Sequence, residues 1–429
     1  MRYIFPENFY WGASTSSHQI EGDNRNNDWW KWEYEGNTER SGKACDHYHR
    51  FKDDFQLAKD IGHNAHRLSI EWSRLERSEG VWDDNEWNHY KKVINTLKSL
   101  EIEPFVTLNH FTIPLWLADK GGWLNPSSIG YFSRFAAKAV KELGNNVKFW
   151  FTFNEPNILA ILAYDYGMWP PCSKNLDEAI LVLRNMLKSH VSAYVKMNET
   201  ATTIPDTIKP IIGIAKAVTT FHPFSKYSPL DRLVTGYRSW FHNYSFITSA
   251  IKGRIVIPSL GTSSTKREIL PAKNTVDYIG LNYYFRHFIQ YKRSFFKNPI
   301  GDFGSHHDHP DGGKTTDMGW EIYPRGIYEV IKSFSKYNLP MIIAENGIAT
   351  TNDDIRKEYI KDHLNFVQLA LSEKSDVFGY LHWSLIDNFE WSEGYSKRFG
   401  LIHVDFETQK RTIKNSAKYL EAIIRTGIV

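Results

Sequence analysis

Two glutamates stand at the ends of apolar runs in this sequence. Glu155 follows the run 147–153 and Asn154, and Glu345 follows the run 341–344. A carboxylic acid can donate a proton, and a carboxylate can accept one or attack an electrophilic carbon. Hydrolysis of a glycosidic bond usually needs two such groups, one protonated and one ionised. A lone glutamate at the end of a strand is more often a salt-bridge partner, so the pair must be judged by its position in the fold.

The elements around these glutamates predict an α/β fold. Eight near-continuous apolar runs alternate with amphipathic helical patterns, as parallel strands buried on both faces do. The expected strands are 10–13, 65–70, 104–108, 147–153, 211–215, 278–281, 341–344 and 378–381, and the expected helices include 50–61, 86–100, 126–143, 176–198, 324–337, 354–371 and 410–424. This order predicts a single-domain (β/α)8 TIM barrel over residues 1–429. A doubly wound sheet also alternates strands with helices, but no GxGxxG motif opens the first helix.

Polar side chains lie within or directly after most of the expected strands. They include His18, Gln19 and Glu21, then Arg67 and Glu71, then Asn109 and His110, Asn154 and Glu155, Asn282 to Tyr284, Glu345 and Asn346, and His382 to Ser384. In a barrel the C-terminal strand ends share the face that carries the active site. The fourth and seventh strands lie three apart, so their glutamates are expected to face each other across the mouth. The segments 167–175 and 286–319 are expected as long loops that roof this face.

The composition excludes several classes of protein. Fifty-two basic and 49 acidic residues give a net charge of +3, too even for a nucleic-acid partner. No run of eighteen apolar residues is present, so no membrane span is expected. The two cysteines, Cys45 and Cys172, and an N-terminus without an apolar signal region predict a cytoplasmic protein. Aromatic residues make up 15% of the chain; most should be core, and some could pack against sugar rings.

No cofactor and no metal are expected. Residues His306, His307, Asp308 and His309 are adjacent, and adjacent residues rarely build a tetrahedral site without distant ligands. Whether the chain forms homo-oligomers stays open at this stage.

Several segments resemble glycoside hydrolase family 1. The family's two catalytic signatures are similar to WFTFNEP at 150–156 and IAENG at 343–347. Further matches, in family order, are FYWGASTSSHQIEG at 9–22, LNHF at 108–111, GLNYY at 280–284, TDMGW at 316–320, HWSLIDNFEW at 382–391 and GYSKRFGL at 394–401. The NEP triplet alone is shared by a wider group of barrels, but the full set covers nearly the whole chain and is specific.

The resemblance implies a retaining mechanism and a set of site residues. Glu155 would be the acid/base and Glu345 the nucleophile, with Arg67 and Tyr284 holding the nucleophile and Asn282 in the same catalytic set. The implied substrate-binding residues are Gln19, His110, Asn154, Trp320, Trp383, Glu390, Trp391 and Phe399. Among them Asn154 would bind the sugar 2-hydroxyl, Trp383 would be a stacking floor, and Trp320 would be an aglycone platform.

Departures from the family patterns of some members narrow the range of substrates that the resemblance implies. Plant thioglucosidases replace the acid by Gln, whereas this chain keeps Glu155. The 6-phospho-glycosidases have Ser and Tyr at the positions of Glu390 and Phe399, although Lys397 matches their phosphate-binding lysine. A carboxylate at position 390 would repel a phosphate and accept hydrogen bonds from neutral hydroxyls.

The implied function is hydrolysis of the non-reducing terminal β-D-glucosyl residue of small β-glycosides or short oligosaccharides, with galactosides and fucosides left open. The alternatives are a 6-phospho-β-glycosidase, a non-catalytic sugar-binding relative, and an unrelated barrel with a phosphate site after its last strands. Glu155 and Glu345 are both present, which argues against the non-catalytic relative. The aromatic and acidic segment 383–391 argues against a phosphate site.

Overall fold

The computed structural model describes residues 4–257, 268–296 and 309–429, and its centre is a closed barrel of parallel strands. The strands are, in order around the barrel, β1 (Tyr10–Ser14), β2 (Ala65–Ser69), β5 (Glu103–Asn109), β6 (Phe149–Asn154), β7 (Ile211–Pro223), β8 (Tyr278–Ile289), β9 (Met341–Asn346) and β10 (Val377–Trp383). Pairing of β1 with β10 closes the ring. The predicted (β/α)8 fold is confirmed, and each expected strand overlaps an observed one.

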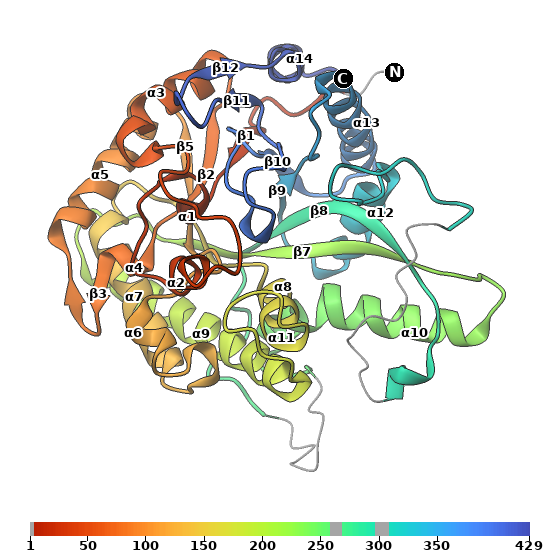
Figure 1. The fold of residues 1–429 in the computed structure, drawn as a ribbon, viewed down its shortest axis with the longest axis horizontal. Coiled ribbons are helices and arrows are strands. Elements are labelled where there is room, and N and C mark those ends of the chain that lie inside the picture. The colour runs from red at the N-terminus through yellow and green to blue at the C-terminus, as the bar shows by residue number, and fades with distance from the viewer. Residues whose placement is uncertain (1–3, 258–267, 297–308) are drawn as a thin grey trace.

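Helices surround the barrel (Figure 1). The longer ones are α3 (His47–Asp60), α5 (Asp84–Ser99), α7 (Ser128–Leu143), α9 (Leu176–Thr203), α10 (Pro229–Ser239), α11 (Ser245–Lys252), α12 (Arg325–Phe334), α13 (Asp353–Ser372) and α14 (Asn415–Thr426). Side-chain caps explain several starts: Asp83, Asn175 and Asn352 accept hydrogen bonds from the first backbone N–H groups of α5, α9 and α13, which have no partner within the helix.

Shorter elements fill the connections. They are the helical turns α1 (Ser17–Ile20), α2 (Asp28–Tyr34), α4 (Trp72–Leu75), α6 (Leu115–Ala118) and α8 (Pro156–Leu159), the hairpins β3 (Glu76–Ser78) with β4 (Val81–Trp82) and β11 (Ile402–Val404) with β12 (Arg411–Ile413), and the 3-10 or π turns η1 (Gly122–Leu124), η2 (Ala160–Asp165), η3 (Trp240–Tyr244), η4 (Arg293–Phe296), η5 (Ser335–Tyr337) and η6 (Trp391–Glu393).

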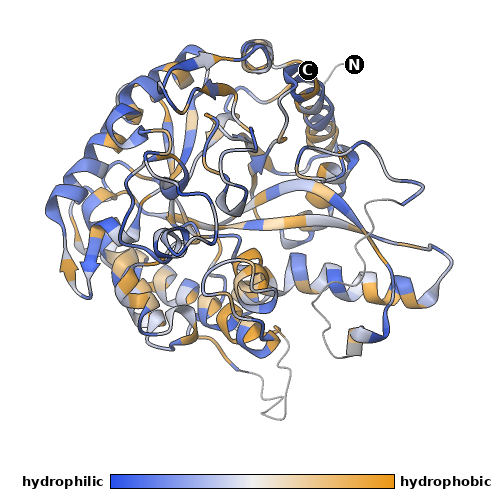
Figure 2. Ribbon diagram, viewed as in Figure 1, coloured by the Kyte–Doolittle hydropathy of each residue, from blue (hydrophilic) through white to orange (hydrophobic). Residues whose placement is uncertain are grey.

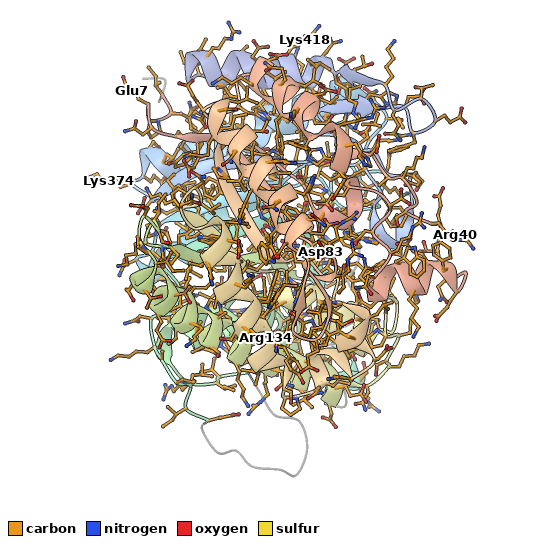
Figure 3. All side chains as sticks on the ribbon, turned by 90° about the vertical axis from the view of Figure 1, so that its left-hand side faces the viewer. Glu7, Arg40, Asp83, Arg134, Lys374 and Lys418 are labelled. Atoms are coloured by element: carbon orange, nitrogen blue, oxygen red, sulfur yellow. The ribbon has the colours of Figure 1, made fainter. Side chains whose placement is uncertain are left out.

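The barrel interior is filled by side chains. Phe105 and Phe149 stack with ring centroids 4.5 Å apart, and Phe151 and Tyr278 pack beside them at 5.0 Å from each other. The helices alternate hydrophobic and hydrophilic residues, as expected when one face packs on the barrel (Figure 2). Charged side chains such as Lys418 project from the periphery (Figure 3). The packed interior means that only the end of the barrel can hold a ligand site.

Two strands are longer than the sequence predicted. The strands β7 and β8 were expected to end at 215 and 281, but they continue to Pro223 and Ile289 and stay paired with each other. In Figure 1 their extensions lead away from the barrel toward α10. The prediction that 286–319 is entirely loop was therefore wrong at its start, because Arg286 pairs with Thr220 in the extended ladder.

The prediction of the last helix was also wrong at its start. Residues Arg411–Ile413 form β12, so α14 begins only at Asn415. The expectation of a helix from 410 failed because residues 411–413 are held by the backbone of β11. The helices α10 and α11, between β7 and β8, were not predicted.

None of the helices in the described parts of the chain is long and apolar enough to cross a membrane. Of the histidine-rich stretch considered above, His306, His307 and Asp308 lie outside the described residues. His309 is hydrogen-bonded through Nε2 to the backbone oxygen of Phe224 at 2.8 Å.

Close contact between β1 and β2 generates a stability prediction. A Cβ at Gly12 would lie 1.8 Å from the carbonyl oxygen of Ala65. We expect Gly12→Ala to lower the free energy of unfolding by about 1–3 kcal/mol or more, because the strands must separate. Gly130 on α7 has open space around it, so Gly130→Ala is the control and should stabilise by roughly 0.5–1 kcal/mol. Urea unfolding measures both, and equal effects would contradict the prediction.

Candidate active site

A cavity of about 670 Å³ lies where the barrel strands end. The sequence-predicted residues that line it are His110, Asn154, Glu155, Asn282, Tyr284, Trp320, Glu345, Trp383, Glu390, Trp391 and Phe399. They lie at or just after the ends of β5, β6, β9 and β10, within β8, and in the loops that follow β8 and β10. Two predicted residues, Gln19 and Arg67, are fully buried and stand behind the wall, in contact with residues that line it.

Glu345, in β9, is held by two donors. Arg67 Nη1 donates to its Oε1 at 2.5 Å, and the Tyr284 hydroxyl donates to its Oε2 at 2.7 Å. Burial raises the pKa of Glu345, while the charge of Arg67 and the hydrogen bond from Tyr284 act in the opposite direction and favour the carboxylate. Because both carboxylate oxygens of Glu345 accept hydrogen bonds, its side chain is held in one orientation. Arg67 and Tyr284 thus orient Glu345 on the cavity wall and favour its anionic form against the effect of burial.

Glu155 immediately follows β6 and has a different environment. Its backbone has φ 46°, in the left-handed region, and its N–H donates to the carbonyl oxygen of Ala215 at 2.8 Å. The turn at Glu155 ends the strand, and Pro156 starts α8. Burial, followed by the negative charge of Glu345, raises the pKa of Glu155 to about 8. Glu155 therefore carries a proton at neutral pH.

A network of amides joins the two glutamates. Asn154 Oδ1 accepts hydrogen bonds from Arg67 Nη2 at 2.7 Å and from Asn282 Nδ2 at 3.0 Å. Asn282 Nδ2 also donates to Glu155 Oε1 at 2.9 Å. Because Arg67 binds Glu345 and Asn282 binds Glu155, this network fixes the two carboxyl groups relative to each other.

Glu390 is a third buried carboxyl group on the wall. Burial, followed by the charge of Glu345, raises its pKa to about 8. Gln19 Nε2 lies 3.3 Å from Glu390 Oε2 and donates to the Phe389 carbonyl oxygen at 2.8 Å. Ser16 donates to Gln19 Oε1 at 2.7 Å, which orients the amide. The structure thus places Gln19 as a support for Glu390 instead of on the cavity surface itself.

Aromatic rings form much of the remaining wall. The rings of Trp383 and Trp391 stack on His110, with centroids 5.8 and 5.9 Å away. Trp320 packs against Tyr284 at 5.4 Å and Phe399 at 6.2 Å. Flat apolar faces beside a few convergent polar groups are typical of small-molecule sites.

Several cavity residues were not predicted. Phe221, Arg238, His242, Phe285 and His287 line the cavity on the side of β7 and β8. Sequence reasoning missed Phe221, Phe285 and His287 because both strands were expected to end earlier, and it missed Arg238 and His242 because α10 and η3 were not predicted. The strand-like composition of 216–223 and 283–289 was the signal that could have revealed the longer strands.

One further contact was missed. Thr107 accepts from Arg67 Nε at 3.0 Å. It is an ordinary strand residue with no motif, so nothing in the sequence distinguished it.

The chain was compared with known proteins once this geometry was clear. The model of Glycosyl hydrolase family 1 matches residues 1–428, and the chain belongs to this family of glycoside hydrolases. It is 33% identical to a 1,4-beta-D-glucan glucohydrolase of Thermotoga neapolitana, over 99% of this chain and 98% of the relative.

Solved structures agree with this assignment. A beta-glycosidase from Pyrococcus horikoshii superposes with a TM-score of 0.91 and 37% identity, over 100% of this chain and 96% of the other. A beta-glucosidase from Thermotoga maritima in complex with deoxynojirimycin superposes with a TM-score of 0.88 and 32% identity, over the full length of both chains.

The electrostatic coupling of the two glutamates can be tested directly. In Glu345→Gln the neighbouring negative charge is lost, so we expect the pKa of Glu155 to fall from about 8 while burial keeps it above the ordinary value. Carbon-13 NMR of labelled glutamate carboxyls across a pH series measures it. Glu421→Gln on α14 is the control and should leave this titration unchanged. An unaltered Glu155 pKa in Glu345→Gln would show that the two groups do not interact.

Proposed function

We propose that this enzyme is a retaining β-glycosidase that removes the non-reducing terminal β-D-glucosyl residue of neutral β-glycosides. The observation that carries the proposal is the contrast between two carboxyl groups in one buried cavity. Glu345 is paired with Arg67 at 2.5 Å and is poised as an anion, whereas the pKa of Glu155 is raised to about 8. One acid and one nucleophile are what a double displacement needs.

In the first step the Glu345 carboxylate attacks the anomeric carbon. The bond from that carbon to the leaving oxygen breaks, and the proton of Glu155 moves to this oxygen, so that the aglycone leaves as an alcohol. A covalent glycosyl ester of Glu345 remains. In the second step water attacks the same carbon, its proton moves to Glu155, and the Glu345 carboxylate is released with net retention of configuration.

The charge coupling suits both steps. While Glu345 is an anion, its charge raises the pKa of Glu155, so that Glu155 holds a proton to donate. Once Glu345 has become a neutral ester, this charge is gone and the pKa of Glu155 falls. Glu155 is then a carboxylate that can accept a proton from water. The same residue therefore changes from acid to base without moving.

We propose that the predicted binding residues recognise the sugar. Asn154, held by Arg67 and Asn282, would contact the 2-hydroxyl, where hydrogen bonds strengthen in the transition state. Glu390 would bind the hydroxyls at the far side of the ring, and Trp383 would pack against its apolar face. Glucosides are the preferred substrate in this proposal, with galactosides and fucosides as the tests of specificity.

The position of Lys397 argues against a 6-phosphoglycoside. Its Nζ donates to the Asp317 carbonyl oxygen at 2.8 Å and lies 3.9 Å from a Glu393 oxygen. Glu390 occupies the wall where a phosphate would need donors. A phosphate placed beside Glu390 would also be repelled by the charge of Glu345, which, after burial, raises the pKa of Glu390 itself.

The proposal includes two broader expectations, one on the domain organisation and one on the location of the protein. We propose that residues 1–429 form one catalytic domain, in line with the family match over 1–428. We also propose a reducing, cytoplasmic location, which the free thiols of Cys45 and Cys172 suit.

Removing the proposed nucleophile should abolish turnover. In Glu345→Gly we expect hydrolysis of 4-nitrophenyl β-D-glucoside to fall on the order of 10⁴-fold or more, as when a covalent nucleophile is deleted. Azide should restore release of nitrophenol, because it can occupy the vacated space and attack directly, giving the α-glucosyl azide. Product NMR identifies the anomer, and wild-type enzyme with azide is the control. Full activity in the variant would refute the assignment of Glu345.

Removing the proposed acid should affect substrates unequally. In Glu155→Gln we expect kcat/KM for an alkyl glucoside to fall by about 10²–10⁴-fold, the usual contribution of a general acid. The loss for 2,4-dinitrophenyl β-D-glucoside should be much smaller, since its leaving group needs no proton. Steady-state kinetics on both substrates measure the difference. Equal losses would contradict an acid role for Glu155.

A further inference from the structure

The cavity extends past the catalytic glutamates toward the extended ends of β7 and β8. Phe221 on β7, and Phe285 and His287 on β8, line this part, together with Arg238 on α10 and His242 on η3. Figure 1 shows the strand extensions reaching toward α10, away from the loops after β10 that carry Glu390. This part of the cavity, the β7–β8 end, is where an aglycone would lie under the proposed function.

Basic side chains gather at the β7–β8 end. Arg238 is the one arginine or lysine among the described residues that line the cavity. Burial holds the pKa of His242 well below its ordinary value, and the nearby charges of Lys216, Arg238 and His287 act in the same direction. His242 therefore lies within electrostatic range of Arg238 and His287. The ring of Phe221 contacts both histidines, at centroid distances of 5.4 and 5.9 Å.

The acidic side chains lie elsewhere in the cavity. Among the described lining residues, the carboxyl groups belong to Glu155, Glu345, Glu390 and Glu393. Three of these surround the proposed sugar position, and Glu393 follows β10 and lies 3.9 Å from Lys397. The favoured anion among them, Glu345, lies at the sugar position and repels an anion there, whereas Arg238 attracts an anion at the β7–β8 end.

The other walls of this end are apolar. Phe285 and Ile289 line it, and Ile289 belongs to the same hydrophobic cluster as Phe221. An aliphatic and aromatic surface favours a flat or hydrocarbon aglycone, and it lowers the local dielectric, which strengthens attraction to a nearby cation. The combination of apolar walls and one guanidinium fits a group that is apolar along its length and anionic at its tip.

We infer that the β7–β8 end is a subsite for β-glucosides whose apolar aglycone carries a carboxylate, with Arg238 as the residue that binds the carboxylate. The planar guanidinium offers paired N–H donors that match the two oxygens of such a group. This inference rests on the proposed function and adds to it the class of aglycone. Arg238 is a specificity residue here and takes no part in bond cleavage.

The test uses a pair of substrates with matched leaving groups. They are the β-D-glucosides of 4-hydroxyphenylacetic acid and of its amide, which differ in charge at the tip and hardly at the phenol. In the wild-type enzyme we expect kcat/KM for the acid to exceed that for the amide about 10-fold, as one charge-assisted hydrogen bond in a partly buried site can provide. In Arg238→Gln this ratio should fall to about one, mainly through KM for the acid.

Arg232, an exposed residue on the same helix, supplies the matched control, and Arg232→Gln should keep the wild-type ratio. A wild-type ratio near one overturns the inference, even if Arg238→Gln cannot be folded. An unchanged ratio in Arg238→Gln overturns it as well. If the inference is overturned but the wild-type enzyme still hydrolyses the amide glucoside, the proposed function is retained. If the wild-type enzyme hydrolyses neither substrate, the proposed function is refuted.

Discussion

The ion pair between Arg67 and Glu345 is the interaction on which the rest of the site depends. Removing two charges from water costs several kcal/mol per ion unless the remaining donors and acceptors are satisfied. Here Arg67 donates to Glu345, Asn154 and Thr107 through three nitrogens, and Tyr284 takes the second oxygen of Glu345. The charge on Glu345 is thereby kept in a place where burial alone would remove it.

That stabilised charge adds to the effect of burial on the other carboxyl groups. Glu155 and Glu390 share the buried cavity with Glu345, and the pKa of each is raised to about 8 by burial and by this charge. The cavity therefore contains one favoured anion and two groups that retain protons at neutral pH. A change in the charge of Glu345 changes the pKa of Glu155, and this is the basis of the acid-to-base change proposed for catalysis.

The barrel makes this coupling possible because it holds polar side chains on stiff strands. Arg67, Asn154, Asn282 and Glu345 come from four different strands, and the stacked rings of the barrel interior beneath them leave little room for movement. The two longest strands add a second feature. By leaving the barrel as a pair, β7 and β8 place Phe221, Phe285 and His287 at one end of the cavity, which Arg238 of α10 also lines.

The sequence alone determined the eight-strand alternation, the barrel, and the residues that carry the carboxyl groups Glu155, Glu345 and Glu390 on the cavity wall, because hydrophobic periodicity and strand-end motifs are local properties. Only the tertiary structure decided which groups touch. Gln19 carries a signature motif, yet it stands behind Glu390; Thr107 carries none, yet it binds Arg67. The ends of β7 and β8 were not predicted either, since how far a strand continues depends on its partner as well as on its own strand-like composition. The raised pKa of Glu155 depends on burial and on a charge 190 residues away in the chain, which no local pattern encodes.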